Sequence, residues 1–355
     1  MKIKSILVAC LLTNYLLANA SLDPAFRKKT ELALTVVNNS GDALEGVDYW
    51  VWYENPFAPN KEGYEFTGET DAEGKLLTKA VSPFGVLIRL QKQGFYSYGA
   101  GVAEDYRILP QPKKHEETIA LRQIVNPIPL YALFNGGGEI PVQSEWVGFD
   151  FEQGDWLEPH GGGKQADILF RYQNECVGFR KNTTRTMDQR RASYQRKCKN
   201  KGIPFTEEAF RHEIGKWDGI LEIAFPGKKE GIVRVEEDFI PQSELHMPHK
   251  APEDGYQSTH RLETVNYFGS EKTHYMKFPD DVGFFLRTRV ILDEKGKIKS
   301  ANYAKIYGEF SFDPRGKVSF YYYYNPIPND RNLEFDTKHN LFPEGTPGTF
   351  NISLP

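Results

Sequence analysis

The chain has 355 residues, which is long enough for two domains of ordinary size. Hydrophobic residues make up 39% and charged residues 26%, a composition that excludes a globally disordered protein. The net charge of −4 is too close to neutral to indicate binding to nucleic acid or a membrane surface, so an electrostatic partner must recognise a local patch. Aromatic residues reach 14%, which favours β structure.

Residues 1–20 predict a cleaved export signal. Two lysines precede an apolar run over 6–17, and residues 18–20 (Ala-Asn-Ala) fit the small-x-small cleavage pattern. The run is about half of the roughly 20 apolar residues that a spanning helix needs, which disfavours a membrane anchor. Lipidation at Cys10 is a further alternative, although almost no hydrophobic segment precedes it. We therefore expect a mature protein from Ser21, secreted, periplasmic or associated with the cell envelope, without a transmembrane segment.

The N-terminal third predicts a series of short strands. The expected strands are 32–37, 47–53, 66–70, 86–92 and 118–122. Turn sequences separate them, and in the turn at 71–74 the glycine can take the positive φ that closes it. Many short strands at this spacing are typical of a β-sandwich.

The order of motifs in this region is more specific than a general sandwich. The motifs are Val36-x-Asn38-x-x-Gly41-x-x-Leu44-x-Gly46-Val47, Thr70-Asp71-x-x-Gly74-Lys75, Gly94-Phe95-Tyr96 and Ile119-x-Leu121. This order resembles the carboxypeptidase regulatory-like (transthyretin-like) module and covers about a quarter of the chain. The resemblance implies an Ig-like sandwich over residues 21–125 that braces a neighbouring domain or presents a surface at the cell envelope. It carries over no catalytic residue.

Residues 126–129 (Asn-Pro-Ile-Pro) predict the joint between two domains, because two prolines hold the backbone extended. The same four residues recur at 325–328, and we expect the two copies to be rigid extended stretches at two ends of one domain. Residues 126–355 are expected to form a larger β-sandwich or jelly-roll-like domain. Its expected strands are 219–225, 231–239, 284–293, 300–312 and 318–324. Apolar alternation in the fourth predicts a half-buried antiparallel strand.

A basic helical insertion is expected at about 176–214. Thr206 is placed to cap its second helix, and two acidic residues follow in the first turn. Nine cationic residues over 180–201 face one carboxylate, Asp188. An exported protein meets polyanions as sulfated or carboxylated glycans, lipopolysaccharide and extracellular DNA, of which anionic polysaccharide is favoured. Salt would weaken the attraction to such a patch. The expected polyanion-binding residues are Arg180, Lys181, Arg190, Arg191 and Arg196. A solvated cationic helix face is the alternative.

Removal of the signal would leave two cysteines, Cys176 and Cys198. In an oxidising compartment such a pair is expected to form a disulfide. A bridge of this span would stabilise the fold by roughly 3 kcal/mol in the chain-entropy model. Two unrelated buried thiols are the alternative.

The densest polar segment lies over 150–167. The candidate ligand-binding residues are Trp146, Asp150, Glu152, Asp155, Trp156 and His160. The carboxylates could hold Ca²⁺, although their spacing differs from the EF-hand pattern, or act as acid and base in glycan hydrolysis. With the two tryptophans they could instead form one exposed sugar-binding surface, which is the arrangement that we expect. The alternative is a Gly-rich loop whose tryptophans fill the core.

Other sequence patterns for catalysis or nucleotide binding are absent. The sequence holds no Gly-x-Ser-x-Gly elbow and no phosphate-binding Gly loop, and a proline between His246 and His249 disfavours a zinc site. The sequence therefore favours an exported, non-catalytic protein that binds glycan or envelope proteins through β-sandwich surfaces. The second hypothesis is a glycan-active hydrolase or lyase that uses carboxylates of 150–167, with the N-terminal module as an accessory.

Overall fold

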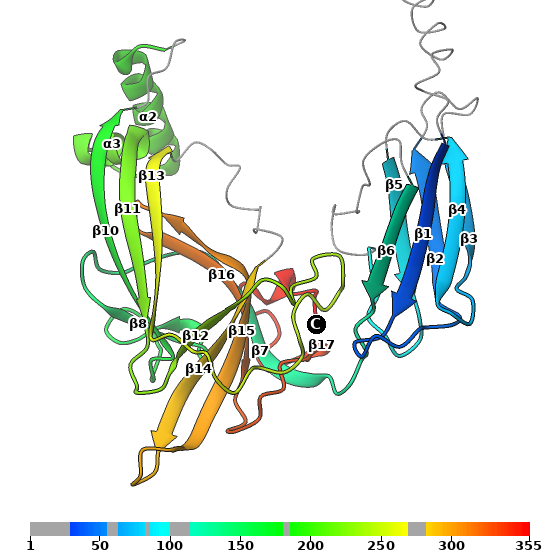
Figure 1. The fold of residues 1–355 in the computed structure, drawn as a ribbon. Helices are drawn as coiled ribbons and strands as arrows, with labels where there is room; N and C mark the ends of the chain where they lie inside the picture. Colours follow the sequence, from blue (N-terminus) through cyan, green and yellow to red (C-terminus); the bar gives the residue numbers. More distant parts are fainter. Residues whose placement is uncertain (1–28, 55–62, 82–84, 100–113, 180–184, 269–281) are drawn as a thin grey trace, which may run out of the picture. The chain divides into compact units, whose positions relative to one another are not determined.

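The structure is a computed structural model, shown in Figure 1. It describes residues 29–54, 63–81, 85–99, 114–179, 185–268 and 282–355. The expected signal at 1–20 lies outside these residues. The chain divides into two compact units, one up to Val125 together with Ile240–His246, the other Asn126–Phe239 with Met247–Pro355. The first boundary between the units, after Val125, coincides with the start of the expected joint. The expected mostly-β fold is confirmed.

The first unit is a sandwich of two three-stranded sheets. Its described strands are β1 (Lys29–Val37), β2 (Asp48–Glu54), β3 (Tyr64–Glu69), β4 (Lys75–Val81), β5 (Gly85–Gln91) and β6 (Lys114–Ala120). The sheet orders are β4-β1-β6 and β3-β2-β5, and β1 pairs parallel with β6. In β2, Val51 and Tyr53 are fully buried, as the two-residue alternation predicts. The strand β4 was not among the expected strands.

Ile240–His246 completes this first unit from far along the chain. Tyr98 forms a bridge to β5, and Ser243 forms a bridge to Tyr98. The backbone N–H of Glu244 donates to the carbonyl of Ser97 at 3.0 Å, and its carboxylate accepts the N–H of Ser97 at 2.9 Å. The predicted domain 21–125 therefore lacks a segment that its own sheet uses.

The second unit packs a five-stranded sheet against a six-stranded sheet. Its described strands are β7 (Ile128–Glu139), β8 (Val147–Asp150), β9 (Asp155–Trp156), β10 (Ile168–Phe179), β11 (Gly215–Ala224), β12 (Gly231–Val235), β13 (Thr259–Phe268), β14 (Gly283–Leu292), β15 (Ile298–Asp313), β16 (Lys317–Asn325) and β17 (Phe335–Asn340). The orders are β13-β11-β10-β8-β9 and β12-β14-β15-β16-β7-β17. The core between the sheets is rich in phenylalanine. The second expected sandwich is thereby confirmed.

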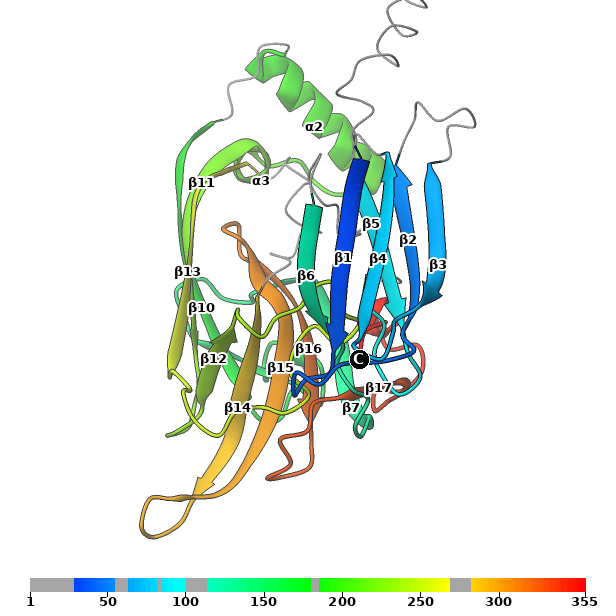
Figure 2. The ribbon, with the colours of Figure 1, turned by 45° about the vertical axis from the view of Figure 1, so that its right-hand side comes forward.

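The helical insertion joins β10 to β11. It consists of α2 (Met187–Lys201) and α3 (Glu207–Ile214), which lie at one end of the β10, β11 and β13 ribbon (Figure 2). A 3₁₀ turn, η3 (Thr349–Asn351), follows β17. In the described residues no helix is long and apolar enough to cross a membrane.

The strand β15 is buried on both faces, so the expectation of a half-buried strand is wrong. Ala304 and Ile306 face the core between the sheets. Lys305 and Tyr307 face a second apolar cluster, and the fully buried Nζ of Lys305 donates to the backbone oxygen of Pro355 at 2.9 Å. Alternate residues of β15 do point to opposite faces, as predicted. However, the face with Lys305 and Tyr307 is covered by a second layer that includes the C-terminal chain.

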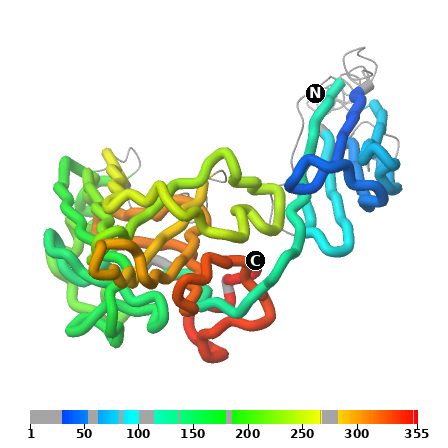
Figure 3. Tube along the Cα trace, turned by 60° about the horizontal axis from the view of Figure 1, so that its bottom comes forward, coloured from blue at the N-terminus to red at the C-terminus, as the bar shows by residue number. Residues whose placement is uncertain are grey.

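The two Asn-Pro-Ile-Pro stretches lie at the same end of the six-stranded sheet, not at opposite ends of the domain. Tyr324 of β16 is opposite Tyr131 of β7 in an antiparallel pair, so the end of β16 meets the start of β7. The C-terminal chain, red in Figure 3, also returns to this place, because β17 pairs with β7. The side chain of Asn332 donates to the carbonyl of Asn126 at 2.7 Å and holds the start of β7.

Candidate functional site

The polar loop after β8 folds around the carboxylate of Asp150. One oxygen accepts the backbone N–H of Glu152 at 2.9 Å, and the other accepts those of Lys164 at 2.9 Å and Gln165 at 3.1 Å. Asp150 is only 2% exposed. Its carboxylate therefore joins the two ends of the loop rather than facing solvent.

Arg289 of β14 binds three carboxylates of this segment. Its Nε and one Nη donate to the two oxygens of Asp167, each at 2.8 Å, in a bidentate pair. The guanidinium also reaches Glu152 at 2.5 Å and Asp150 at 3.2 Å. Burial raises the pKa of the Asp167 carboxyl, and Arg289 acts in the opposite direction. The acids thus compensate one partly buried cation.

The backbone of Arg289 is strained. Its φ is 51°, in the left-handed region that side-chain-bearing residues rarely adopt. The pairing of β14 with β15 shifts register between Thr288 and Ile291, which turns the guanidinium towards the loop. Sequence reasoning missed Arg289, because it lies 122 residues from Asp167 and no local pattern connects the two.

Trp156 belongs to the core, so the expectation of one exposed surface with Trp146, Asp150 and Asp155 is wrong. Its exposed fraction is 8%, and its ring meets those of Phe149 and Phe170 edge-on, with centroids 5.3 and 5.7 Å apart. The physical reason is register. Trp156 pairs directly with Phe149 and therefore shares its inward face.

The glycines after this strand are explained by close packing around Asp155. Its carboxylate accepts the N–H of Trp156 and of Gly162, each at 2.8 Å. A Cβ at Gly161 would lie 2.5 Å from that carboxylate, and one at Gly163 would lie 2.8 Å from the carbonyl of Trp156. The Gly-rich exit therefore lets the loop close on itself.

The six candidate residues are thus separated by burial. His160 and Trp146 are exposed, Glu152 and Asp155 are partly exposed, and Asp150 and Trp156 are buried. Within the described ranges, no group of three or more His, Cys, Asp and Glu side chains is arranged to hold a metal ion. The oxygens of Asp150 and Asp167 already accept hydrogen bonds, which disfavours them as Ca²⁺ ligands.

The helical hairpin is capped at both helix starts. The hydroxyl of Thr186 accepts the N–H of Gln189, whose side chain accepts the N–H of Thr186 in return. Thr206 accepts the N–H of Ala209, which confirms the predicted cap. Phe210 of α3 is buried between the helices, and its ring lies 5.8 Å from that of Tyr194 of α2.

The helix α3 supplies acids that pair with the cations of α2. Arg191 lies 2.9 Å from Glu207, and Lys197 lies 2.5 Å from Glu213. The expectation that the basic segment faces Asp188 alone is therefore wrong, because folding brings a second helix against it. Arg191 stabilises the hairpin and also lies over the ring of Phe210.

The opposite face of α2 stays cationic. Arg196 and Lys199 point away from the α3 contacts and are exposed. In the part of the chain that the structure describes, no carboxylate lies within ion-pair distance of either. Arg190 is half-buried and has a partner, whereas Arg180 and Lys181 lie outside the described residues.

The predicted disulfide is absent, and that prediction is wrong. Cys176 is exposed and Cys198 is buried, both as free thiols. Cys176 lies in β10 opposite Trp217, whereas Cys198 lies on the face of α2 that packs inside the hairpin. The two side chains belong to different elements, and their sequence spacing does not bring them together.

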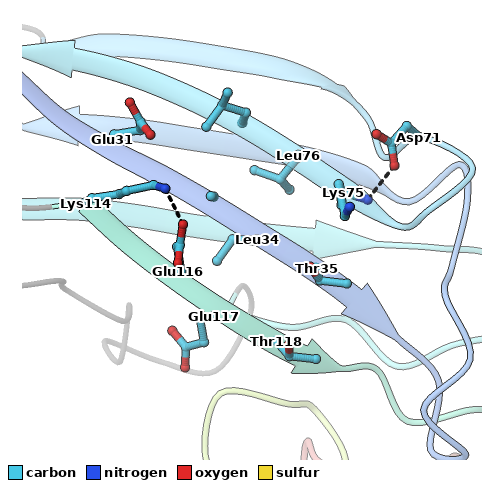
Figure 4. A pocket seen from close by; sticks show the side chains of 12 residues that line it. Glu31, Leu34, Thr35, Asp71, Lys75, Leu76, Lys114, Glu116, Glu117 and Thr118 are labelled. Carbon is cyan, nitrogen blue, oxygen red and sulfur yellow. Dashed lines mark hydrogen bonds and ion pairs between the residues drawn. The ribbon is translucent and has the colours of Figure 1, made fainter.

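The first unit carries a groove of about 670 Å³ along β1 on the β4-β1-β6 sheet (Figure 4). Two ion pairs hold charged side chains of its lining. Glu31 lies 2.7 Å from Lys79, whose hydrogen bond lowers the pKa of the Glu31 carboxyl. Lys114 pairs with Glu116, which raises the pKa of Lys114. Asp71, Lys75 and Glu117 also line the groove, so acids and bases alternate within it.

No protein-family model matches this sequence, and no curated protein matches it. The 3-chlorocatechol 1,2-dioxygenase from Rhodococcus opacus matches 29% of this chain and 62% of its own, at 13% identity and a TM-score of 0.23. The major pilin subunit of Bacillus cereus matches 83% of this chain and 95% of its own, at 9% identity and a TM-score of 0.20. The shaft pilin from Lactobacillus rhamnosus GG matches 41% of this chain and 59% of its own, at 16% identity and a TM-score of 0.20.

This chain spans less than two thirds of a 3-chlorocatechol, a catechol and a chlorocatechol 1,2-dioxygenase that it matches. At such identities and TM-scores, the matches assign neither activity nor partner.

Proposed function

We propose that this protein is an exported, non-catalytic β-sandwich protein that binds anionic polysaccharide through the α2–α3 hairpin. The signal-like pattern of residues 1–20 supports export, and the motif order supports a transthyretin-like module in the first unit. The observation that carries the proposal is the unpaired cationic face of α2 around Arg196 and Lys199.

This face differs from an ordinary solvated helix surface in how its charges are distributed. The acids of α3 pair with the cations nearest to them, Arg191 and Lys197, so the remaining cations are left on the other side. Lys201 and Arg211 are also exposed in the hairpin. Such a one-sided positive field attracts a polyanion, and the attraction weakens as salt screens it.

Two carboxylates of 150–167, those of Asp150 and Asp167, are disfavoured as hydrolytic groups. Glycan hydrolysis needs one carboxyl that donates a proton and another that faces the sugar or a water. Asp150 and Asp167 are buried and both bind Arg289, so they are not available as such a pair.

The test removes the two unpaired charges with R196Q/K199Q and measures heparin binding by titration calorimetry at 50 and 300 mM salt. Each exposed ion pair contributes about 0.2–1 kcal/mol, so the affinity at low salt should fall roughly two- to thirtyfold. The double variant K295Q/K299Q removes two exposed lysines from the β14–β15 turn region and should bind like the wild type. Unchanged affinity in R196Q/K199Q, or no heparin binding by the wild type at low salt, would refute the proposal.

A further inference from the structure

A row of side chains crosses the outer face of the five-stranded sheet. Arg171 of β10 lies opposite Glu222 of β11, and Glu222 lies opposite Arg261 of β13. Phe170 pairs with Val147 of β8, so the next position along β10, Arg171, faces Trp146. Phe170 and Val147 point into the core, and the row therefore points outwards.

The row is held in place by its own contacts. Arg171 donates from Nε to the carboxylate of Glu222 at 2.8 Å, and a second guanidinium nitrogen lies 2.8 Å from the same oxygen. The same guanidinium lies 4.5 Å from the ring centroid of Trp146. Trp146 nevertheless remains 41% exposed. Its indole is thus fixed by Arg171 but not covered.

The turn before Trp146 is fastened to β10 in a strained conformation. Ser144 has a φ of 65°, which is uncommon for a residue with a side chain, and its N–H donates to the carbonyl of Tyr172 at 2.9 Å. The side chains of Gln143 and Asn174 hydrogen-bond at 2.6 Å. Strain of this kind persists where the surrounding structure enforces it and is frequent at ligand-binding positions.

Apolar side chains flank the row and the polar loop borders it. Leu169 and Ile220 are half-buried on the same outer face. A Cβ on Gly148 would lie 2.7 Å from Leu157 and 2.9 Å from Ala166, so the loop that carries His160 lies on this face next to Trp146. Neighbouring strands lie about 4.8 Å apart, so the row from Trp146 to Arg261 is roughly 14 Å long.

We propose that this row binds an uncharged stretch of glycan. The exposed indole of Trp146 offers a flat apolar surface for a sugar ring, and the side chains of Arg171, Glu222 and Arg261 offer donors and acceptors for hydroxyl groups. Each cation of the row has an acid beside it, Glu222 for Arg171 and the neighbouring Glu263 for Arg261, which disfavours a polyanion here. The inference rests on the proposed glycan-binding function and adds a second contact whose strength does not depend on salt.

The test titrates the full-length protein with four neutral hexasaccharides, namely cellohexaose, xylohexaose, mannohexaose and chitohexaose, at 50 and 300 mM salt. At least one should bind with the same affinity at both salt concentrations. W146A should weaken that binding roughly 5- to 150-fold, the loss expected when a stacking aromatic is removed, whereas W146F should retain most of it. R261A should weaken it less.

Two controls separate the outcomes. F350A removes another exposed aromatic ring and should leave hexasaccharide binding unchanged, and W146A should keep the melting temperature and the heparin affinity of the wild type. If no hexasaccharide binds the wild type, or W146A binds as the wild type does, the inference is overturned. Either result leaves the heparin test of the hairpin unaffected, so the failure of one proposal is distinguishable from that of the other.

Discussion

The roles of individual residues in the second unit follow from register rather than from residue type. Trp146 precedes the polar segment 150–167 and Trp156 lies ten positions on, within it, yet one is exposed and the other is packed against Phe149. The acids of the same segment differ in the same way, because Asp150 and Asp167 converge on a cation from a distant strand. A buried carboxylate needs such a partner to stay charged.

Replacement of Arg289 tests this cluster. R289L should destabilise the second unit by about 3–5 kcal/mol at pH 7, because it leaves buried carboxylates without their cation. The pKa of Asp167 is already raised by burial, and loss of the guanidinium raises it further. The folded state of the variant then takes up a proton more readily than the unfolded state, so the loss shrinks as the pH falls through the raised pKa.

Urea unfolding of R289L and the wild type at pH 7 and pH 4.5 measures the effect. R211L changes an exposed arginine of α3 and should alter stability by less than about 0.5 kcal/mol at either pH. An equal loss at both pH values for R289L would mean that lost packing, not charge, accounts for it.

At the scale of elements, local signals located turns and helix caps well. The turn at 71–74 forms as predicted, with Gly74 at a φ of 70° and the Asp71 carboxylate accepting two backbone N–H groups. The cap at Thr206 also forms where the hydroxyl and the acids indicate. By contrast, the sequence pattern did not predict β10 and β13. The ends of these long strands are exposed on one face, so polar and apolar side chains follow one another there without a clear two-residue period.

The two cysteines give a prediction that depends on these elements. Iodoacetamide should alkylate Cys176 in the native, unreduced protein, because its side chain is exposed, and Cys198 only after denaturation, because it is buried in the hairpin. For the chain from Ser21, which lacks Cys10, mass spectrometry should therefore show one added group before unfolding and two after it. C176S should show one group fewer in each state. If the unreduced, denatured protein takes up no iodoacetamide, the two cysteines form a disulfide after all.

At the scale of the whole molecule, the first unit is not one continuous stretch of chain. Ile240–His246 supplies backbone hydrogen bonds to 97–99, and Ile240 packs against the core of the unit. Strand addition of this kind stabilises an edge through main-chain pairing while a side chain anchors it.

The fragment 21–125 should therefore fold but melt below the first unit of the intact chain. A synthetic peptide of residues 236–250 should raise its melting temperature by roughly 4–8 °C for each kcal/mol of binding at saturation. The same peptide with Ile240→Asp and Glu244→Ala should have little effect, because it lacks both the apolar anchor and the carboxylate that accepts the N–H of Ser97. Calorimetry that shows equal melting with and without the wild-type peptide would mean that 21–125 is complete by itself.

The sequence by itself determined the mostly-β class, the strands with clear two-residue alternation, the turns and the cap at Thr206. These features depend on neighbouring residues, so the local pattern contains the physical cause. The tertiary structure alone decided which tryptophan faces solvent, which acids Arg289 compensates, which cations α3 leaves unpaired and that both faces of β15 are covered. Each of these depends on residues distant in sequence, since burial and charge pairing are set by what packs opposite a side chain.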